Sequence, residues 1–175
     1  MSEIVVRRAT PDDAAALALV GAAAFLESYA HMIGSADMIA HIGRHYGPDA
    51  FGRFLADPDC ALWIAQLGEA GAPIGFSLLT PPDLPLADIG PGDAELRRIY
   101  SLSRFHGGGL GWRLLQPLID HARAAGRTRL LVGVHDGNTK AIAFYRRAGF
   151  VDAGRRTFRV GVTDYDDLVM AMPLA

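Results

Sequence analysis

A glycine cluster between a strand pattern and a helix pattern constrains this chain more than any other feature. Residues 95–103 read as an apolar strand, and a helical pattern begins near Gly109. Glycine reaches backbone angles closed to other residues and adds no bulk, so several N–H groups can point at one ligand. The helix N-terminus adds unpaired N–H groups and a positive dipole end. The segment therefore predicts a phosphate or pyrophosphate site. Its glycines are Gly107, Gly108, Gly109 and Gly111.

Length and charge bound what the chain can be. Its 175 residues fit one domain spanning 1–175, and 50% hydrophobic residues suffice for a buried core. A formal charge of −2 argues against nucleic acid or an anionic membrane as the main partner, because both need a basic face. We expect neither partner.

The cysteine and histidine content argues against an internal disulfide and against a metal site. One cysteine, Cys60, cannot form an internal disulfide, and its apolar surroundings predict a buried, inert thiol. The longest apolar run, 14–26, follows two acids and is too short to span a bilayer. We therefore expect a cytoplasmic protein. No pair of histidines has the flanking acids and spacing of a metal site, so we assign no metal.

The order of patterns along the chain predicts a mixed α/β fold around one twisted sheet. The expected strands are 4–8, 61–67, 73–80, 95–103, 129–134, 150–160 and 168–172. The expected helices are 10–29, one or two within 31–56, one from about 109 to 125, and 138–149. Prolines make 81–92 a loop, and Pro117 predicts a kink in the helix that contains it.

Residues 106–111 and 138–150 carry a resemblance to a known family. The first segment reads HGGGLG, and the second reads NTKAIAFYRRAGF. They resemble the two signatures of GCN5-related N-acetyltransferases (GNAT). In the first signature an apolar strand precedes Arg or Gln, two variable residues, Gly, a variable residue, and Gly or Ala. His106 replaces the Arg or Gln, whereas the second segment departs in no important position.

The resemblance implies a single GNAT domain: a central mixed, twisted sheet of about seven strands with helices on both faces. It also implies acetyl-CoA as the acetyl donor and, by analogy, a homodimer. Main-chain groups of the central strand would pair with pantetheine, and the glycine turn would hold the pyrophosphate. The coenzyme-binding residues expected on this basis are Ser101, Leu102, Ser103, His106, Gly107, Gly108, Gly109, Leu110, Gly111, Asn138 and Tyr145.

Two residues are candidates for proton transfer. A free alkylamine has a pKa near 10.4, so roughly one molecule in a thousand is neutral at pH 7 and a base is useful. Glu95 matches the family's base; its alternative is a strand-end acid paired with Arg97 or Arg98. Tyr145 matches the family's acid, which protonates the departing thiolate. Its alternative is packing of its helix on the sheet.

The acceptor is the least determined part of the prediction. Residues 95–102, 133–150 and 157–174 are similar to bacterial spermidine/spermine N-acetyltransferases, which makes a polyamine one candidate among small primary amines. An amino acid, an aminoglycoside or a protein N-terminus are alternatives. Residues that match the family's acceptor pocket are Phe25, Glu27, Tyr29 and His31. The loop acids Asp83, Asp88 and Asp93 could attract a cation or be ordinary surface charges.

Two alternative functions belong to other classes of protein. A non-catalytic acyl-CoA sensor would keep the glycine turn and Asn138 without needing Glu95 or Tyr145. A Rossmann dinucleotide site would need G-x-G-x-x-G, but Gly107, Gly109 and Trp112 occupy those positions.

Overall fold

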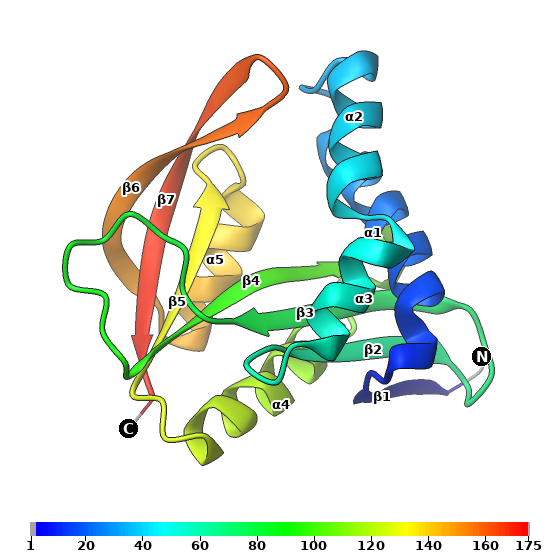
Figure 1. Ribbon diagram of the computed structural model, residues 1–175, viewed down its shortest axis with the longest axis horizontal. Helices are drawn as coiled ribbons and strands as arrows, with labels where there is room; N and C mark the ends of the chain where they lie inside the picture. The colour runs from blue at the N-terminus through cyan, green and yellow to red at the C-terminus, as the bar shows by residue number, and fades with distance from the viewer. Residues whose placement is uncertain (1–2, 175) are drawn as a thin grey trace.

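A seven-stranded sheet in the order β1-β2-β3-β4-β5-β7-β6 organises the protein (Figure 1). The computed structural model describes residues 3–174. Of these neighbouring strands only β4 and β5 run parallel. The strands are β1 (Ile4–Arg8), β2 (Ala61–Leu67), β3 (Pro73–Thr80), β4 (Asp93–Ser101), β5 (Arg129–His135), β6 (Val151–Val160) and β7 (Thr163–Pro173).

Helices cover both faces of the sheet, as the sequence predicted. They are α1 (Ala14–Tyr29), α2 (Ser35–His45), α3 (Pro48–Ala56), α4 (Leu110–Ala124) and α5 (Thr139–Ala148), with short 3-10 turns η1 (Pro11–Asp13) and η2 (Ser103–Phe105). Leu62 and Ile64 of β2 pack with α1, whereas Trp63 packs with α4. Because both faces are covered, β2 reads as a continuous apolar run.

Two strand boundaries differ from those predicted. β4 covers Asp93–Ser101 instead of 95–103, because its first residues pair with Arg129 and Leu130 at the start of β5. β7 begins at Thr163 instead of 168. Its polar first half belongs to an exposed hairpin with β6, so that part has no apolar alternation to reveal it.

β4 leaves β5 soon after the two strands meet. Only Asp93, Ala94 and Glu95 of β4 are in register with β5. On its other edge β4 is irregular: Leu78 of β3 pairs with Arg98 but Leu79 pairs with Leu96, so Arg97 is an extra residue. Such a bulge bends a strand and increases its twist. Figure 1 shows the resulting divergence, with β4 turning away from β5.

The loop before β4 is tied to the first residue of β5. Nε and Nη2 of Arg129 each donate to the Asp93 carboxylate at 2.7 Å, and Nη1 donates to Asp88 at 2.7 Å. Asp83, farther up the loop, accepts from Arg97 at 3.3 Å. The three acids are therefore paired with arginines, which favours ordinary structural charges over attraction of a cationic substrate.

Other local expectations concern single residues. Cys60 is buried, and burial raises the pKa of its thiol to about 11. Pro117 lies inside α4, where Ser77 Oγ donates to the nearby Leu114 carbonyl at 2.9 Å. The kink expected at Pro117 stays a prediction. Within residues 3–174, no helix is long and apolar enough to cross a membrane, and no group of three His, Cys, Asp or Glu side chains could hold a metal.

Replacing Arg129 by methionine should destabilise the fold, because it leaves the Asp93 carboxylate, only 6% exposed, without its partner. We expect a loss of about 2–3 kcal/mol in unfolding free energy at pH 7 by urea denaturation. Arg129 lowers the pKa of Asp93, so the pair stabilises above the ordinary carboxyl pKa and the benefit disappears as pH falls. The deficit should therefore shrink towards pH 3.

Arg146→Met is the matched control, since its ion pair with Asp152 is more than half exposed on both sides and should contribute little. Equal losses in the two variants, or a deficit independent of pH, would contradict the role given to Arg129.

Candidate active site

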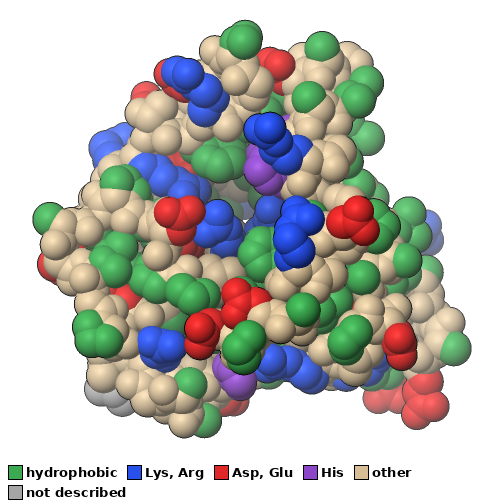
Figure 2. All heavy atoms as spheres, viewed as in Figure 1, with side chains coloured by type: hydrophobic (Ala, Val, Ile, Leu, Met, Phe, Trp, Pro, Cys, Tyr) green, Lys and Arg blue, Asp and Glu red, His purple; other side chains and the backbone are tan. Residues whose placement is uncertain are grey.

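A cavity of about 370 Å³ lies between the β6–β7 hairpin and helices α1 and α2. This volume is within the range of small-molecule sites. Figure 2 shows the hollow from its open side, with Lys and Arg side chains on both sides and histidine beside it. Its lining comprises Phe25, Tyr29, Met32, Ile33, His41, His45, Tyr46, Glu95, Arg97, Arg98, Tyr100, Gly133, His135, Arg156, Phe158, Arg159, Val160, Tyr165 and Asp167.

Glu95 lies on the β4 wall of this cavity, at the last residue where β4 and β5 pair. It is 2% exposed. One carboxylate oxygen accepts the Asp83 N–H at 2.7 Å and lies 3.7 Å from Arg97 Nη1. Burial nevertheless raises the pKa of Glu95, outweighing the hydrogen bond and the nearby Arg97 and Arg156. Its pKa is thus moved in the direction that suits a general base near neutral pH.

Tyr145 occupies the opposite face of the sheet. It is buried on α5 in contact with Phe144 and Phe150, each with its ring centroid 5.5 Å away. Burial raises the pKa of its phenol, with a further contribution from Tyr29 on α1. The Tyr145 hydroxyl keeps its proton throughout the physiological pH range.

Asn138 is the N-cap of α5, at the start of the helix predicted over 138–149. Its Oδ1 accepts the Ala141 N–H at 3.1 Å. Burial raises the pKa of the Tyr29 phenol, and Tyr100 and Asn138 oppose this effect only in part. A contact with the pantetheine arm stays a prediction.

The glycine turn has the geometry of an anion site. Gly107 and Gly109 have φ of +82° and +78°, and Gly109 is the N-cap of α4. The Arg113 N–H donates to the Gly109 carbonyl, so the first-turn N–H groups before it, 110–112, are the ones a helix leaves open to an anion. No atom lies within 4 Å of a Cβ built on Gly107, Gly108 or Gly109. These residues fit a pyrophosphate.

Gly111 serves packing instead. A Cβ on it would lie 3.3 Å from the Phe144 ring, so its small size allows α4 to approach α5.

His106 braces the end of β4. Its Nε2 is 2.9 Å from the Ser101 carbonyl oxygen, which can only accept, so Nε2 carries the hydrogen. The side chain that replaces the expected Arg or Gln thus folds back on the strand. A direct contact with coenzyme phosphates stays a prediction for it and for Leu110.

The expectation that Leu102 and Ser103 lie on the central strand is wrong. β4 ends at Ser101, and Ser103 begins η2. Leu102 still donates to the Ile74 carbonyl of β3 at 2.9 Å. The strand ends early because Glu27 of α1 accepts both the Ser103 N–H at 2.7 Å and its hydroxyl at 2.6 Å. These bonds turn the chain into η2.

The four predicted acceptor residues separate into two groups. Phe25 and Tyr29 line the cavity. Glu27 is exposed and bonded to Ser103, and His31 is exposed outside the lining. The far wall was missed altogether: it comes from α2 and from the β6–β7 hairpin. The alternation of Arg156, Phe158 and Val160 along β6 was the one signal that could have revealed it.

Residues 26–150 match the Acetyltransferase (GNAT) family. The chain belongs to this family. An uncharacterized N-acetyltransferase of Mycobacterium tuberculosis is 29% identical, over 93% of this chain and 98% of the relative. The N-alpha-acetyltransferase RimI of the same organism is 33% identical, over 67% of this chain and 70% of its own length.

A solved structure shares the fold of this GNAT chain. It is the PaiA N-acetyltransferase from Thermoplasma acidophilum in complex with coenzyme A, with a TM-score of 0.79, 20% identity, and coverage of 98% of this chain and 99% of that one. The predicted GNAT fold is confirmed. Family membership makes the protein an acetyl-CoA-dependent N-acetyltransferase. The Rossmann alternative is wrong, since only one strand pair of the described sheet is parallel.

The glycine turn of the GNAT domain can be tested by one pair of substitutions. Gly109→Ala forces a Cβ into the left-handed region, which costs about 1–2 kcal/mol and disturbs the turn that presents the N–H groups. We expect coenzyme A affinity to fall by at least about 5-fold by isothermal titration calorimetry. Gly108→Ala is the control, because Gly108 has no positive φ and open space around it. Equal affinities of the two variants would disprove this view of the turn.

Proposed function

We propose that this GNAT enzyme transfers the acetyl group of acetyl-CoA to a primary amine of a small molecule by direct attack, without a covalent enzyme intermediate. One observation carries the proposal. β4 bears buried Glu95 on the wall of the cavity, parts from β5 after that residue, and is followed by η2 and the glycine turn. A single strand thereby connects the base, the donor site and the acceptor cavity.

The donor would be held along β4. The glycine turn and the start of α4 would bind the pyrophosphate through N–H groups. The β4 edge beyond Glu95, which β5 leaves, would bind pantetheine as an added strand. Bound acetyl-CoA supplies an activated thioester carbonyl, and an N–H at the end of β4 could polarise it.

Glu95 would take the proton of the amine, directly or through water. About one alkylamine molecule in a thousand is neutral at pH 7, so assisted deprotonation raises the reactive fraction. A carboxylate with a raised pKa accepts that proton more readily than an ordinary glutamate does.

Tyr145 would return a proton to the departing thiolate. Its raised pKa keeps the hydroxyl protonated and therefore able to donate a proton. The alternative role, packing of α5 through Phe144 and Phe150, is compatible with the same position.

The charge of the cavity distinguishes the candidate acceptors. Four arginines and two carboxylates line it, and the loop acids are paired with arginines. This balance disfavours a polyamine or an aminoglycoside, which carry several positive charges. It favours an amino acid among the alternatives. β6 is an edge strand, so a homodimer through the late strands stays an expectation.

Replacement of Glu95 by glutamine should lower kcat/KM on the order of 100-fold or more at pH 7, because the amide cannot accept the proton. In the wild type, kcat/KM should rise with pH through a pKa above the usual glutamate range, and this limb should vanish in Glu95→Gln. Thiol release measured with acetyl-CoA and an amine panel supplies both profiles. Unchanged coenzyme A affinity is the control.

If Glu95→Gln kept the wild-type rate and profile, another base would be required. If the wild type bound acetyl-CoA but acetylated no amine of the panel, the protein would be the acyl-CoA sensor.

Replacement of Tyr145 by phenylalanine should lower kcat at least 10-fold while leaving coenzyme A affinity within about 3-fold. The ring and its packing remain, so only the proton donor is lost. Because the phenol pKa is raised, the wild-type rate should show no decline from Tyr145 ionisation up to pH 10. Wild-type turnover by Tyr145→Phe across this range would assign the residue to packing alone.

A further inference from the structure

The acceptor cavity is lined by more positive than negative side chains. Figure 2 shows basic residues on both sides of the hollow. Three of its four arginines have carboxylate partners: Arg159 makes two bonds to Asp164 at 2.6 and 2.8 Å, Arg97 lies between Asp83 and Glu95, and Arg156 pairs with Asp167. Arg98 of β4 has no carboxylate partner in the described chain, and Arg156 of β6 uses only its Nε.

Arg156 is fixed with its terminal nitrogens available. Its Nε donates to Asp167 at 3.0 Å, and its guanidinium carbon is 5.1 Å from the Phe158 ring centroid. Nη1 and Nη2 have no hydrogen-bond acceptor among residues 3–174. A guanidinium offers these two donors side by side, which matches the two oxygens of a carboxylate.

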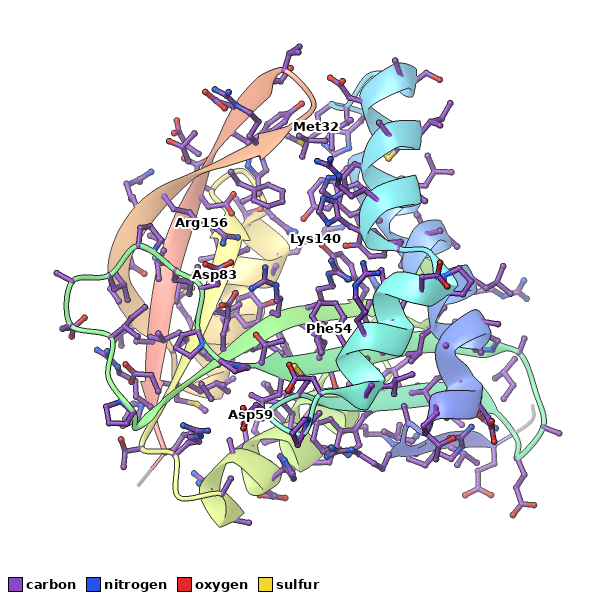
Figure 3. The ribbon with its side chains drawn as sticks, viewed as in Figure 1. Met32, Phe54, Asp59, Asp83, Lys140 and Arg156 are labelled. Carbon is purple, nitrogen blue, oxygen red and sulfur yellow. The ribbon has the colours of Figure 1, made fainter. Side chains whose placement is uncertain are left out.

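Gly133 of β5 makes this position possible. A Cβ on Gly133 would lie 2.7 Å from both the guanidinium carbon and Nη2 of Arg156. The guanidinium therefore lies directly on the β5 backbone, as the placement of Arg156 beside β5 in Figure 3 illustrates. Any side chain at position 133 would displace the Arg156 guanidinium from this place.

The available donors are close to the base. Glu95 is in register with Leu131, two residues before Gly133 on β5, a separation of about 7 Å along a strand. Arg156 also acts on the ionisation of Glu95, opposing the effect of burial. A carboxylate on the Arg156 nitrogens would thus leave an amine on the neighbouring carbon facing Glu95.

Arg98 contributes a second positive charge from β4. Its guanidinium carbon lies 4.4 Å from the Tyr46 ring centroid, and Nη1 donates to the His45 carbonyl at 3.1 Å. Within the described chain no carboxylate lies within ion-pair distance of it. Burial, and then His45 and Arg98, lower the pKa of His41 to about 4. His41 is therefore neutral at pH 7 and adds no charge to the cavity.

We propose that the acceptor is an amine that also carries a carboxylate, as an α-amino acid does, and that Nη1 and Nη2 of Arg156 bind this carboxylate. Arg98 adds long-range attraction. The aromatic wall formed by Phe25, Tyr29 and Phe158 receives an apolar or aromatic side chain. The inference rests on the proposed acetyltransferase function and deepens it.

Matched substrate pairs test this directly. Each L-amino acid of a panel, beginning with L-phenylalanine, is compared with its decarboxylated amine, beginning with 2-phenylethylamine, and spermidine is included. Thiol release from acetyl-CoA gives kcat/KM for each. The wild type should favour the acid-bearing member of its preferred pair at least about 10-fold, as expected for a charge-assisted bond.

Arg156→Gln should reduce this preference to about one while changing kcat/KM for the decarboxylated amine less than about 3-fold. A purely structural defect would lower both substrates alike. Arg156→Lys should restore part of the preference. Arg155→Gln is the control, since Arg155 immediately precedes Arg156 in β6 and pairs with exposed Asp136 outside the cavity lining.

In Arg156→Gln the buried Asp167 carboxylate would lose its partner, which could disturb the fold. Two further measurements exclude misfolding as the cause of a lost preference. The double variant Arg156→Gln/Asp167→Asn removes both charges and should show the same lost preference. Calorimetry with N-acetyl-L-phenylalanine should show binding to the wild type and none to Arg156→Gln.

These experiments distinguish failure of the carboxylate inference from failure of the proposed acetyltransferase function. Turnover of amines without preference for the carboxylate-bearing members, or best turnover of spermidine, would overturn the inference and leave the acetyltransferase function intact. Binding of acetyl-CoA with no turnover of any compound would overturn the proposed function itself, and this inference with it.

Discussion

The parallel pairing of β4 with β5 ends at Glu95, and the rest of the site depends on that break. The bulge at Arg97 turns β4 away, so the strand keeps β3 on one edge and loses β5 on the other. Main-chain polar groups inside a protein require partners, and an opened edge offers them to a ligand. The same break leaves Glu95 buried yet on the cavity wall, which is the cause of its raised pKa.

The sheet separates the two proton-transfer candidates. Glu95 belongs to the face covered by α1 and α2, and Tyr145 belongs to the face covered by α4 and α5. Burial raises the pKa of both, which makes the carboxylate a better proton acceptor and keeps the phenol a proton donor. The same effect, desolvation of the charged form, therefore supports opposite roles in the two residues. Glu95 is still ionised near neutral pH and can accept a proton, whereas Tyr145 stays protonated and can donate one.

Local patterns predicted the architecture well, and long-range contacts limited the prediction of the site. The apolar run of β2, the helix that starts at Asn138 and the glycine turn depend on neighbours in sequence, and each was foreseen. The bond between Arg129 and Asp93 joins residues 36 positions apart, so the loop acids seemed free. Arg156 was not predicted as a site residue, because nothing near it in sequence indicates that Gly133 admits its guanidinium. Residues brought together only by the fold escape a reading of local periodicity.

The most direct measurement is a crystal structure of the protein with bound coenzyme A. The pyrophosphate should lie on the N–H groups of the Gly107–Gly109 turn and the first turn of α4. The pantetheine arm should follow β4 beyond Glu95, and the sulfur should lie in the gap from β5, near Tyr145 and facing the cavity. Coenzyme bound elsewhere, or a pantetheine arm that avoids the gap, would contradict the account.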